Sequence, residues 1–222
     1  MKLTIVGHGK MGKMVEQLAP EYGFTIHSII DMNDDISAAK GTDVAIEFTT
    51  PHAAMANIRA LTNIAVPTVV GTTGWLEHLE DARTAVAAAQ TALIWSSNFS
   101  IGVNVFLRVV EEASRLLANQ PQYGAWAWEI HHNTKKDAPS GTLLSLVRAM
   151  QEAGYARTID QSSNRAGTHP GTHEIGFDSG ADTITLRHTA RSREGFVRGA
   201  LKAAQWLPGK KGVFEFKDIL FS

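Results

Sequence analysis

Residues 3–12 read LTIVGHGKMG, a short apolar run that leads directly into glycines at positions 7, 9 and 12. The glycines fit the pattern G-x-G-x-x-G, and apolar residues at helical spacing follow them. In such a strand–turn–helix unit the first glycine permits the tight turn, the second lets the backbone approach a pyrophosphate, and the third lets the helix pack on the strand. The N–H groups at the helix N-terminus then bind the phosphates. The stretch predicts dinucleotide binding, although glycines that only pack a turn would give the same six residues.

The second apolar run, residues 24–30, closes on an acidic residue that bears on the cofactor. Asp31 follows the last glycine by about 20 residues, the spacing at which a carboxylate binds the adenosine ribose. A carboxylate there repels a 2′-phosphate, so Asp31 favours NADH over NADPH. His8 and Lys10 can still reach a phosphate, and either cofactor stays open. The predicted contacts of the glycine loop are Gly7, His8, Gly9, Lys10, Met11 and Gly12.

The same alternation continues through residues 44–48, 67–70 and 92–95, each an apolar run followed by small or polar residues and a helical pattern. Strands and helices that alternate in this way predict a Rossmann-type, doubly wound parallel sheet in an α/β fold. The carboxyl ends of such strands form the ligand crevice. Further cofactor contacts are therefore expected after the fourth and fifth runs, although glycine and threonine also end strands for turn reasons. These residues are Gly71, Thr72, Thr73, Ser96, Ser97, Asn98 and Phe99.

After residue 99 the pattern changes to that of a smaller α+β domain. It predicts a long amphipathic helix over 103–117, a strand over 125–132 and a helix over 141–150. The polar, glycine-rich stretch 153–171 shows no strand pattern, whereas 174–177 and 183–189 do. A last helical pattern, 196–207, is expected to return with the tail to the first domain. The predicted dinucleotide domain is thus 1–99 with 194–222, and 100–193 forms a second domain. A cleft between two such domains is a usual place for substrate to meet cofactor.

The densest polar chemistry lies in residues 129–142, EIHHNTKKDAPSGT. His131 and Lys135 can each transfer a proton or neutralise an anion. On a strand, His132 would point to the opposite face from His131. The N–H groups of Gly141 and Thr142, at the start of a helix, can bind a carboxylate or phosphate. The run predicts a site for an anionic small molecule. The plainer alternative is a solvated basic loop in which Ser140 only caps the helix.

Composition excludes several other classes of protein. The 21 Lys and Arg residues nearly balance 22 Asp and Glu, so no net charge draws the chain to nucleic acid or an anionic membrane. The absence of cysteine removes disulfides, thiolate nucleophiles and iron–sulfur clusters. No apolar run approaches the roughly 18 residues of a membrane span, and the first residues leave no room for a signal peptide, so a cytoplasmic location is expected.

Two further chemistries fit the sequence poorly. His169 and His173 lie four apart beside Glu174, which on a helix would suggest a metal site, but Pro170 and Gly171 oppose a helix. No metal is therefore predicted. Ser140 lacks the G-x-S-x-G elbow of a serine hydrolase. His188 and Arg191, in and after a late strand, are expected to serve structure or an interface.

Several segments together resemble the dihydrodipicolinate reductase family of diaminopimelate and lysine biosynthesis. They are residues 129–132 with Lys135, and 137–142, 10–12, 71–75, 98–104, 165–167 with 171–173, and 188–193. The resemblance implies a two-domain homotetramer that reduces a cyclic pyridine dicarboxylate precursor with NADH or NADPH. It also implies that His131 donates the proton, that Lys135 is a further donor, that His132 contacts substrate, and that Gly141 and Thr142 hold a substrate carboxylate.

The sequence departs from the family pattern at the cofactor site. The glycine loop is one residue shorter than usual, Lys10 stands where arginine is common, and Met32 replaces an arginine that helps some members hold a 2′-phosphate. The chain is also compact around residues 32–42. Two rival functions stay open: a non-enzymatic dinucleotide sensor, and another reductase of this architecture, such as an amino-acid or sugar-acid dehydrogenase.

Overall fold

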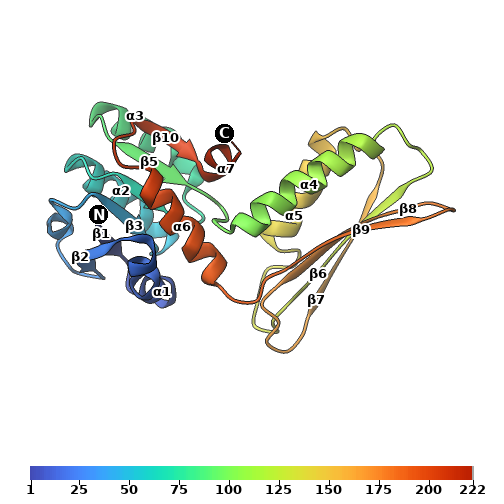
Figure 1. The fold of residues 1–222 in the computed structure, drawn as a ribbon, viewed down its shortest axis with the longest axis horizontal. Coiled ribbons are helices and arrows are strands. Elements are labelled where there is room, and N and C mark those ends of the chain that lie inside the picture. The colour runs from blue at the N-terminus through green and yellow to red at the C-terminus, as the bar shows by residue number, and fades with distance from the viewer. Residues whose placement is uncertain (222) are drawn as a thin grey trace. The chain divides into compact units, whose positions relative to one another are not determined.

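The computed structural model describes residues 1–221 (Figure 1), and contacts divide the chain into two compact units. The first comprises residues 1–101 and the segment from Glu194 onward, and the second comprises residues 102–193. The predicted boundaries at residues 99 and 194 lie within two residues of this division. No helix in the described part of the chain is long and apolar enough to cross a membrane.

The first unit is built on a six-stranded sheet of order β10-β5-β4-β3-β1-β2, in which every pair is parallel. From β1 the chain passes to β2 on one side and then to β3 on the other, so the strand order reverses between β1 and β3. The predicted Rossmann-type sheet is confirmed. Its strands are β1 (Lys2–Val6), β2 (Thr25–Ile30), β3 (Val44–Glu47), β4 (Thr68–Val70), β5 (Ala92–Trp95) and β10 (Gly212–Glu215).

Helices cover both faces of this sheet, which explains why its strands are continuous apolar runs rather than alternating ones. On one face, Ile5 and Ile46 pack with Val15 and Ala200. On the other face, Val70 packs with the second and third helices of the unit. The helices are α1 (Lys10–Leu18), α2 (Pro51–Asn63), α3 (Leu79–Ala88), α6 (Glu194–Trp206) and α7 (Phe216–Leu220), with short 3-10 turns η1 (Ala19–Tyr22), η2 (Ile36–Ala39) and η3 (Leu76–His78).

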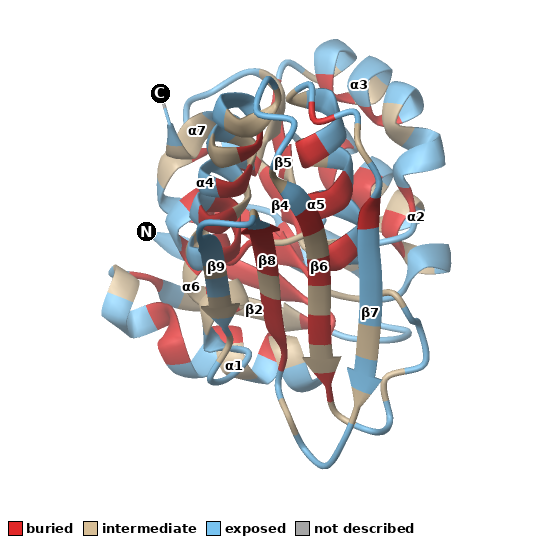
Figure 2. Cartoon of the chain, turned by 90° about the vertical axis from the view of Figure 1, so that its right-hand side faces the viewer, coloured by how far each residue is buried: buried red, intermediate tan, exposed pale blue. Residues whose placement is uncertain are grey.

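The second unit has a mixed four-stranded sheet of order β7-β6-β8-β9, in which only β6 and β7 are parallel. Burial alternates along the central strand β6, and the two edge strands of the sheet, β7 and β9, are largely exposed (Figure 2). The buried face packs on two helices through Phe106 and Leu143. The elements are α4 (Ile101–Leu117), β6 (Gly124–His131), α5 (Gly141–Glu152), β7 (Ile159–Arg165), β8 (Thr172–Asp178) and β9 (Thr183–Thr189).

The expectation of no strand in 153–171 is wrong, because β7 occupies Ile159–Arg165. Of its seven residues, IDQSSNR, only Ile159 is buried, so the strand carries no apolar pattern. Backbone pairing with β6 forms it instead. The predicted return of the tail to the first domain is accompanied by an unpredicted strand, β10, which pairs with β5.

Candidate active site

The glycine loop between β1 and α1 has the geometry that a dinucleotide needs. Gly7 has a φ of +91°, and a Cβ there would lie 2.2 Å from the carbonyl oxygen of Phe48. A Cβ at Gly12 would lie 2.0 Å from the Gly7 oxygen, so neither position accepts a side chain. Gly9 differs: a Cβ there would meet nothing within 4 Å, and no side chain caps α1. The helix N-terminus is therefore accessible to a phosphate, with its first N–H groups unpaired.

The side chains of this loop contribute unequally. His8 is paired through Nε2 with Glu16 at 2.8 Å, along α1. Met11 packs against the hydrophobic core, and Lys10 is exposed. Among the predicted cofactor contacts of this loop, the three glycines can therefore contribute only backbone groups. Lys10 can contribute an exposed ammonium group.

Asp31 lies at the carboxyl end of β2, next to this loop. The Gly7 N–H donates to the carbonyl of Ile30 at 2.8 Å, which places the following residue beside the glycine turn. Asp31 is exposed, its Oδ1 accepts from the Met32 N–H at 2.9 Å, and its own N–H donates to Asp34. Two carboxylates, those of Asp31 and Asp34, therefore lie close together just after β2.

The loops after β3 and β4 meet at Phe48, which the sequence analysis did not predict as part of the site. The Phe48 ring would lie 2.0 Å from a Cβ at Gly71, and its carbonyl closes on Gly7. Thr72 is buried and accepts the Thr49 N–H through Oγ1 at 2.7 Å, while Thr73 is exposed. Phe48 directly follows β3, and no sequence motif marks it. Its contacts with Gly7 and Gly71 in the folded chain are what show that it packs between the loops.

The loop after β5 contains hydrogen bonds between its own residues. Ser96 Oγ accepts the Asn98 N–H at 3.1 Å and donates to the Asn98 carbonyl. Ser97 is exposed. Phe99, a predicted cofactor contact, is buried and packs on Phe216 with ring centroids 4.9 Å apart. Its side chain thus belongs to the core.

In the second unit, a fully buried carboxylate on β6 organises the candidate substrate site. Glu129 Oε1 accepts from the Ser140 N–H, the Ser163 hydroxyl and Arg165 Nη2, each at 2.9 Å. Its Oε2 faces His131 Nδ1 at 3.4 Å and His173 Nε2 at 3.3 Å. Burial alone would raise the pKa of Glu129, but hydrogen bonds from His173, Ser140 and Arg165 hold that pKa well below its usual range. The group is therefore ionised at neutral pH.

His131 ends β6 and is 8% exposed. Its Nδ1 faces Glu129, while its Cδ2–Nε2 edge lies against Gly171, where a Cβ would be only 3.0 Å from the ring. Burial lowers the pKa of His131 to about 4, and the Glu129 charge opposes the shift. The ring is thus neutral at neutral pH. Because the carboxylate favours the proton on Nδ1, Nε2 is left as the basic nitrogen.

The sequence predicts anion contacts at Lys135 and at the start of α5, and both positions carry hydrogen-bond donors. Lys135 Nζ pairs with both Asp137 oxygens, at 2.8 and 2.9 Å. Ser140 caps the helix by accepting the Leu143 N–H, which leaves the N–H groups of Gly141 and Thr142 without a partner inside the helix. A Cβ at Gly141 would meet nothing within 4 Å.

Arg165 completes this site, whereas His132 does not take part in it. Arg165 also donates from Nη2 to the Asp137 carbonyl, and its buried Nε has no hydrogen-bond partner within residues 1–221. His132 lies outside the cluster, with Nδ1 at 2.7 Å from the Thr134 hydroxyl.

In the structure, His173 has a different partner from the one that its sequence neighbours suggest. His173 does not join Glu174, which pairs with Arg187, but lies opposite Glu129 in the β6–β8 register. The ligand atoms of Glu129, His131 and His173 lie within 4.8 Å of one another. Three donors already occupy Glu129 Oε1, one of them a guanidinium, so the cluster is better described as an ion-pair network than as a cation site.

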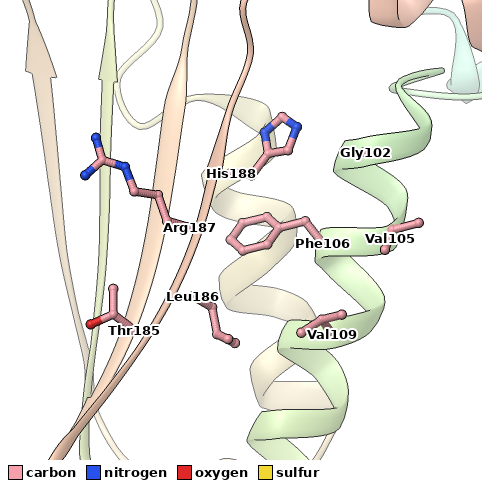
Figure 3. A pocket seen from close by; sticks show the side chains of 8 residues that line it. All are labelled: Gly102, Val105, Phe106, Val109, Thr185, Leu186, Arg187 and His188. Atoms are coloured by element: carbon pink, nitrogen blue, oxygen red, sulfur yellow. The ribbon is translucent and has the colours of Figure 1, made fainter.

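A separate groove of about 330 Å³ lies between α4 and β9 (Figure 3). His188 lines it, stacked on Phe106 with ring centroids 5.9 Å apart. None of the predicted site residues lines this groove. The groove residues are Gly102, Val105, Phe106, Val109, Thr185, Leu186, Arg187 and His188.

Two family models match nearly the whole chain: the N-terminus of dihydrodipicolinate reductase over residues 1–99, and its C-terminus over residues 102–220. The chain belongs to the dihydrodipicolinate reductase family. The resemblance predicted from sequence is therefore confirmed.

Relatives and solved structures agree with this assignment. The 4-hydroxy-tetrahydrodipicolinate reductase of Christiangramia forsetii is 35% identical over 99% of this chain and 98% of its own length. That of Methanoregula boonei is 39% identical over 82% of this chain and 76% of its own. The dipicolinate-bound dihydrodipicolinate reductase from Paenisporosarcina sp. TG-14 has the same fold, with a TM-score of 0.84 at 19% identity and 99% coverage of both chains. Scyllo-inositol dehydrogenase from Lactobacillus casei, with NAD(H) bound, matches more distantly at a TM-score of 0.55, covering 93% of this chain and 87% of its own.

Proposed function

We propose that this chain reduces 4-hydroxy-tetrahydrodipicolinate to tetrahydrodipicolinate in diaminopimelate and lysine biosynthesis, which would place it in the cytoplasm. The observation that carries the proposal is the buried cluster in which Glu129 faces His131, beside Lys135 and the N-terminus of α5. A dinucleotide sensor has no need of such a site. The relative whose structure holds dipicolinate, a pyridine dicarboxylate, supports an anionic ring as ligand.

A substrate with two carboxylates needs two sets of donors. Lys135 is one, and the first-turn N–H groups at Gly141 and Thr142 are the other, with His132 at the rim. Charge-assisted hydrogen bonds of this kind contribute about 1.5–3 kcal/mol each. The Asp137 carboxylate that now holds Lys135 fixes the ammonium in place before substrate arrives.

The nicotinamide cofactor supplies the hydride when bound. The glycine loop fits such a cofactor, because Gly7 and Gly12 close the turn while Gly9 leaves open space at the start of α1. The hydroxylated ring must also lose its 4-hydroxyl group as water, which gives the conjugated dihydrodipicolinate ring. Hydride addition to that ring leaves an enamine-like anion, and protonation at the neighbouring carbon completes the reduction.

We assign that proton to His131. In the free protein the ring is neutral, since its pKa is about 4. A doubly anionic substrate beside the ring stabilises the imidazolium and raises this pKa, which prepares Nε2 to donate. General acid catalysis of this kind typically contributes about 10²–10⁴-fold.

A coupled assay tests the function. Aspartate semialdehyde and pyruvate, condensed by a dihydrodipicolinate synthase, generate the ring, and consumption of NADH is followed by absorbance. Tight NADH binding without turnover would favour the sensor, and turnover only of amino or sugar acids would favour another dehydrogenase.

Cofactor preference gives a second prediction. We expect kcat/KM with NADH to exceed that with NADPH by about tenfold, since Asp31 and Asp34 repel a 2′-phosphate by roughly 1.4 kcal/mol. Asp31→Ser should reduce the ratio of kcat/KM with NADH to kcat/KM with NADPH. Asp218 is an exposed carboxylate on α7, and Asp218→Asn should leave this ratio unchanged. A wild-type preference for NADPH would refute this role of Asp31.

Lys135→Ala should raise KM by about tenfold or more and also lower kcat, because it removes a clamp worth about 1.5–3 kcal/mol and leaves Asp137 facing an anion. Steady-state kinetics measure both. Lys136→Ala, an exposed lysine next in sequence, is the matched control and should change neither by more than about twofold. Equal effects of the two variants would remove the clamp role.

We further propose that the chain forms a homotetramer through its second unit, as the resemblance implies. Val105 and Val109 expose 44% and 45% of their surface along the groove of Figure 3, an apolar surface suited to burial. Sedimentation velocity should give the mass of four chains, and Val109→Asp should lower it. A monomeric wild-type protein would contradict the proposal.

A further inference from the structure

A second buried carboxyl group lies in the first unit. Glu47 is the last residue of β3 and is fully buried. Its Oε1 accepts from the Thr49 hydroxyl and from Asn57 Nδ2, the latter at 3.4 Å. Its Oε2 is buried without a hydrogen-bond partner in residues 1–221. Burial raises the pKa of Glu47, and hydrogen bonds from Thr49, Thr72 and Asn57 oppose that shift.

Such a group is costly in a strand whose other residues are apolar. Burying an imperfectly paired polar group disfavours folding, and the preceding residues Ala45 and Ile46 show that the strand packs well without one. Packing alone therefore gives no reason for a carboxyl at the end of β3.

The carboxyl group instead ties together two loops at the carboxyl edge of the sheet. The Thr49 hydroxyl donates to the Glu47 side chain, and the Thr49 N–H donates to Thr72 Oγ1 at 2.7 Å. The Gly71 N–H donates to the Glu47 carbonyl at 2.9 Å. Glu47 thus holds the loop after β3 and the loop after β4 at a fixed separation.

We infer that Glu47 is a positioning residue for the nicotinamide half of the cofactor, acting through Thr49, Thr72 and the loop 71–73. The inference rests on the proposed function, because it requires a dinucleotide at this edge. The glycine loop and α1, which would bind the pyrophosphate, make no hydrogen bond to the Glu47 side chain within residues 1–221. Loss of this side chain should therefore weaken the nicotinamide half and spare the ADP-ribose half.

Dissociation constants for NADH and for ADP-ribose, which lacks the nicotinamide, test this separation. We expect Glu47→Ala to weaken NADH binding by about tenfold or more through lost hydrogen bonds, with ADP-ribose binding unchanged within about twofold. Glu47→Gln keeps an oxygen for the Thr49 hydroxyl and should stay within about threefold of wild type for NADH. Thr68→Val is the matched control: this buried β4 hydroxyl donates to Val66 at 3.0 Å, outside the cluster, and should change neither constant.

Thr49→Val is a milder variant for the case in which Glu47→Ala fails to fold. It should weaken NADH binding by about fivefold and leave ADP-ribose binding unchanged. Equal losses for both ligands, or no loss for NADH in folded Glu47→Ala or Thr49→Val, would overturn the inference and leave the proposed function standing. A wild-type protein that binds neither ligand would overturn both.

Discussion

Replacement of His131 by alanine should lower kcat by about 10²–10⁴-fold, with little change in KM. The reason is that the ring supplies a proton at the chemical step, while Lys135 and the start of α5 carry most of the binding. His78→Ala, an exposed histidine of the first unit, serves as control and should leave both constants unchanged. A wild-type kcat in His131→Ala would remove the residue from the acid role.

The pH dependence of the wild-type protein tests the same role. Since the pKa of free His131 is about 4, its protonated fraction falls about tenfold per pH unit above that value. The value of kcat/KM, which reports the free protein, should therefore fall as pH rises through neutrality. The value of kcat should fall only at higher pH, because bound substrate raises the pKa. A His131→Ala variant should lose this dependence.

Much of the first unit could be predicted from sequence because its physics is local. Continuous apolar runs such as Ile5 and Val6 mark strands covered on both faces, and Gly12 is required by the Gly7 carbonyl oxygen only five residues away. Gly7 is required by the more distant carbonyl of Phe48, but the glycine pattern already marks it in the sequence. The two strands that were missed, β7 and β10, lie at sheet edges. Edge strands form by backbone pairing and bury few side chains, so their residues need not be apolar.

The candidate substrate site was only half predictable. His131 and Lys135 lie in one short stretch of sequence. Glu129 shares a strand face with His131 because the two residues are two positions apart on β6. His173 and Arg165 come from β8 and β7, and they reach Glu129 through the pairing of those strands with β6. That register is a tertiary property, and without it His173 was interpreted beside its sequence neighbours instead.

Removal of the central carboxylate should have the largest effect on stability. Glu129→Ala leaves the Arg165 guanidinium, the Ser140 N–H and two histidines around an empty buried position, and breaking a buried ion pair in this way typically costs about 3–5 kcal/mol. For a chain of this size the melting temperature should fall by about 2–4 °C per kcal/mol. Urea unfolding followed by circular dichroism, together with thermal scans, measures both quantities.

Glu129→Gln separates charge from shape. The amide oxygen can still accept the Ser140 N–H, so we expect a loss of only about 1–3 kcal/mol and a folded protein at 25 °C. The variant nevertheless removes the negative charge that favours the His131 imidazolium, and kcat should fall well beyond what the stability loss explains. Glu174→Gln is the matched control on β8, since its pair with the half-exposed Arg187 should contribute less than about 1 kcal/mol. If Glu129→Gln kept wild-type kcat, the carboxylate would serve folding alone, and the proton on His131 would have to be held by the substrate without help from β6.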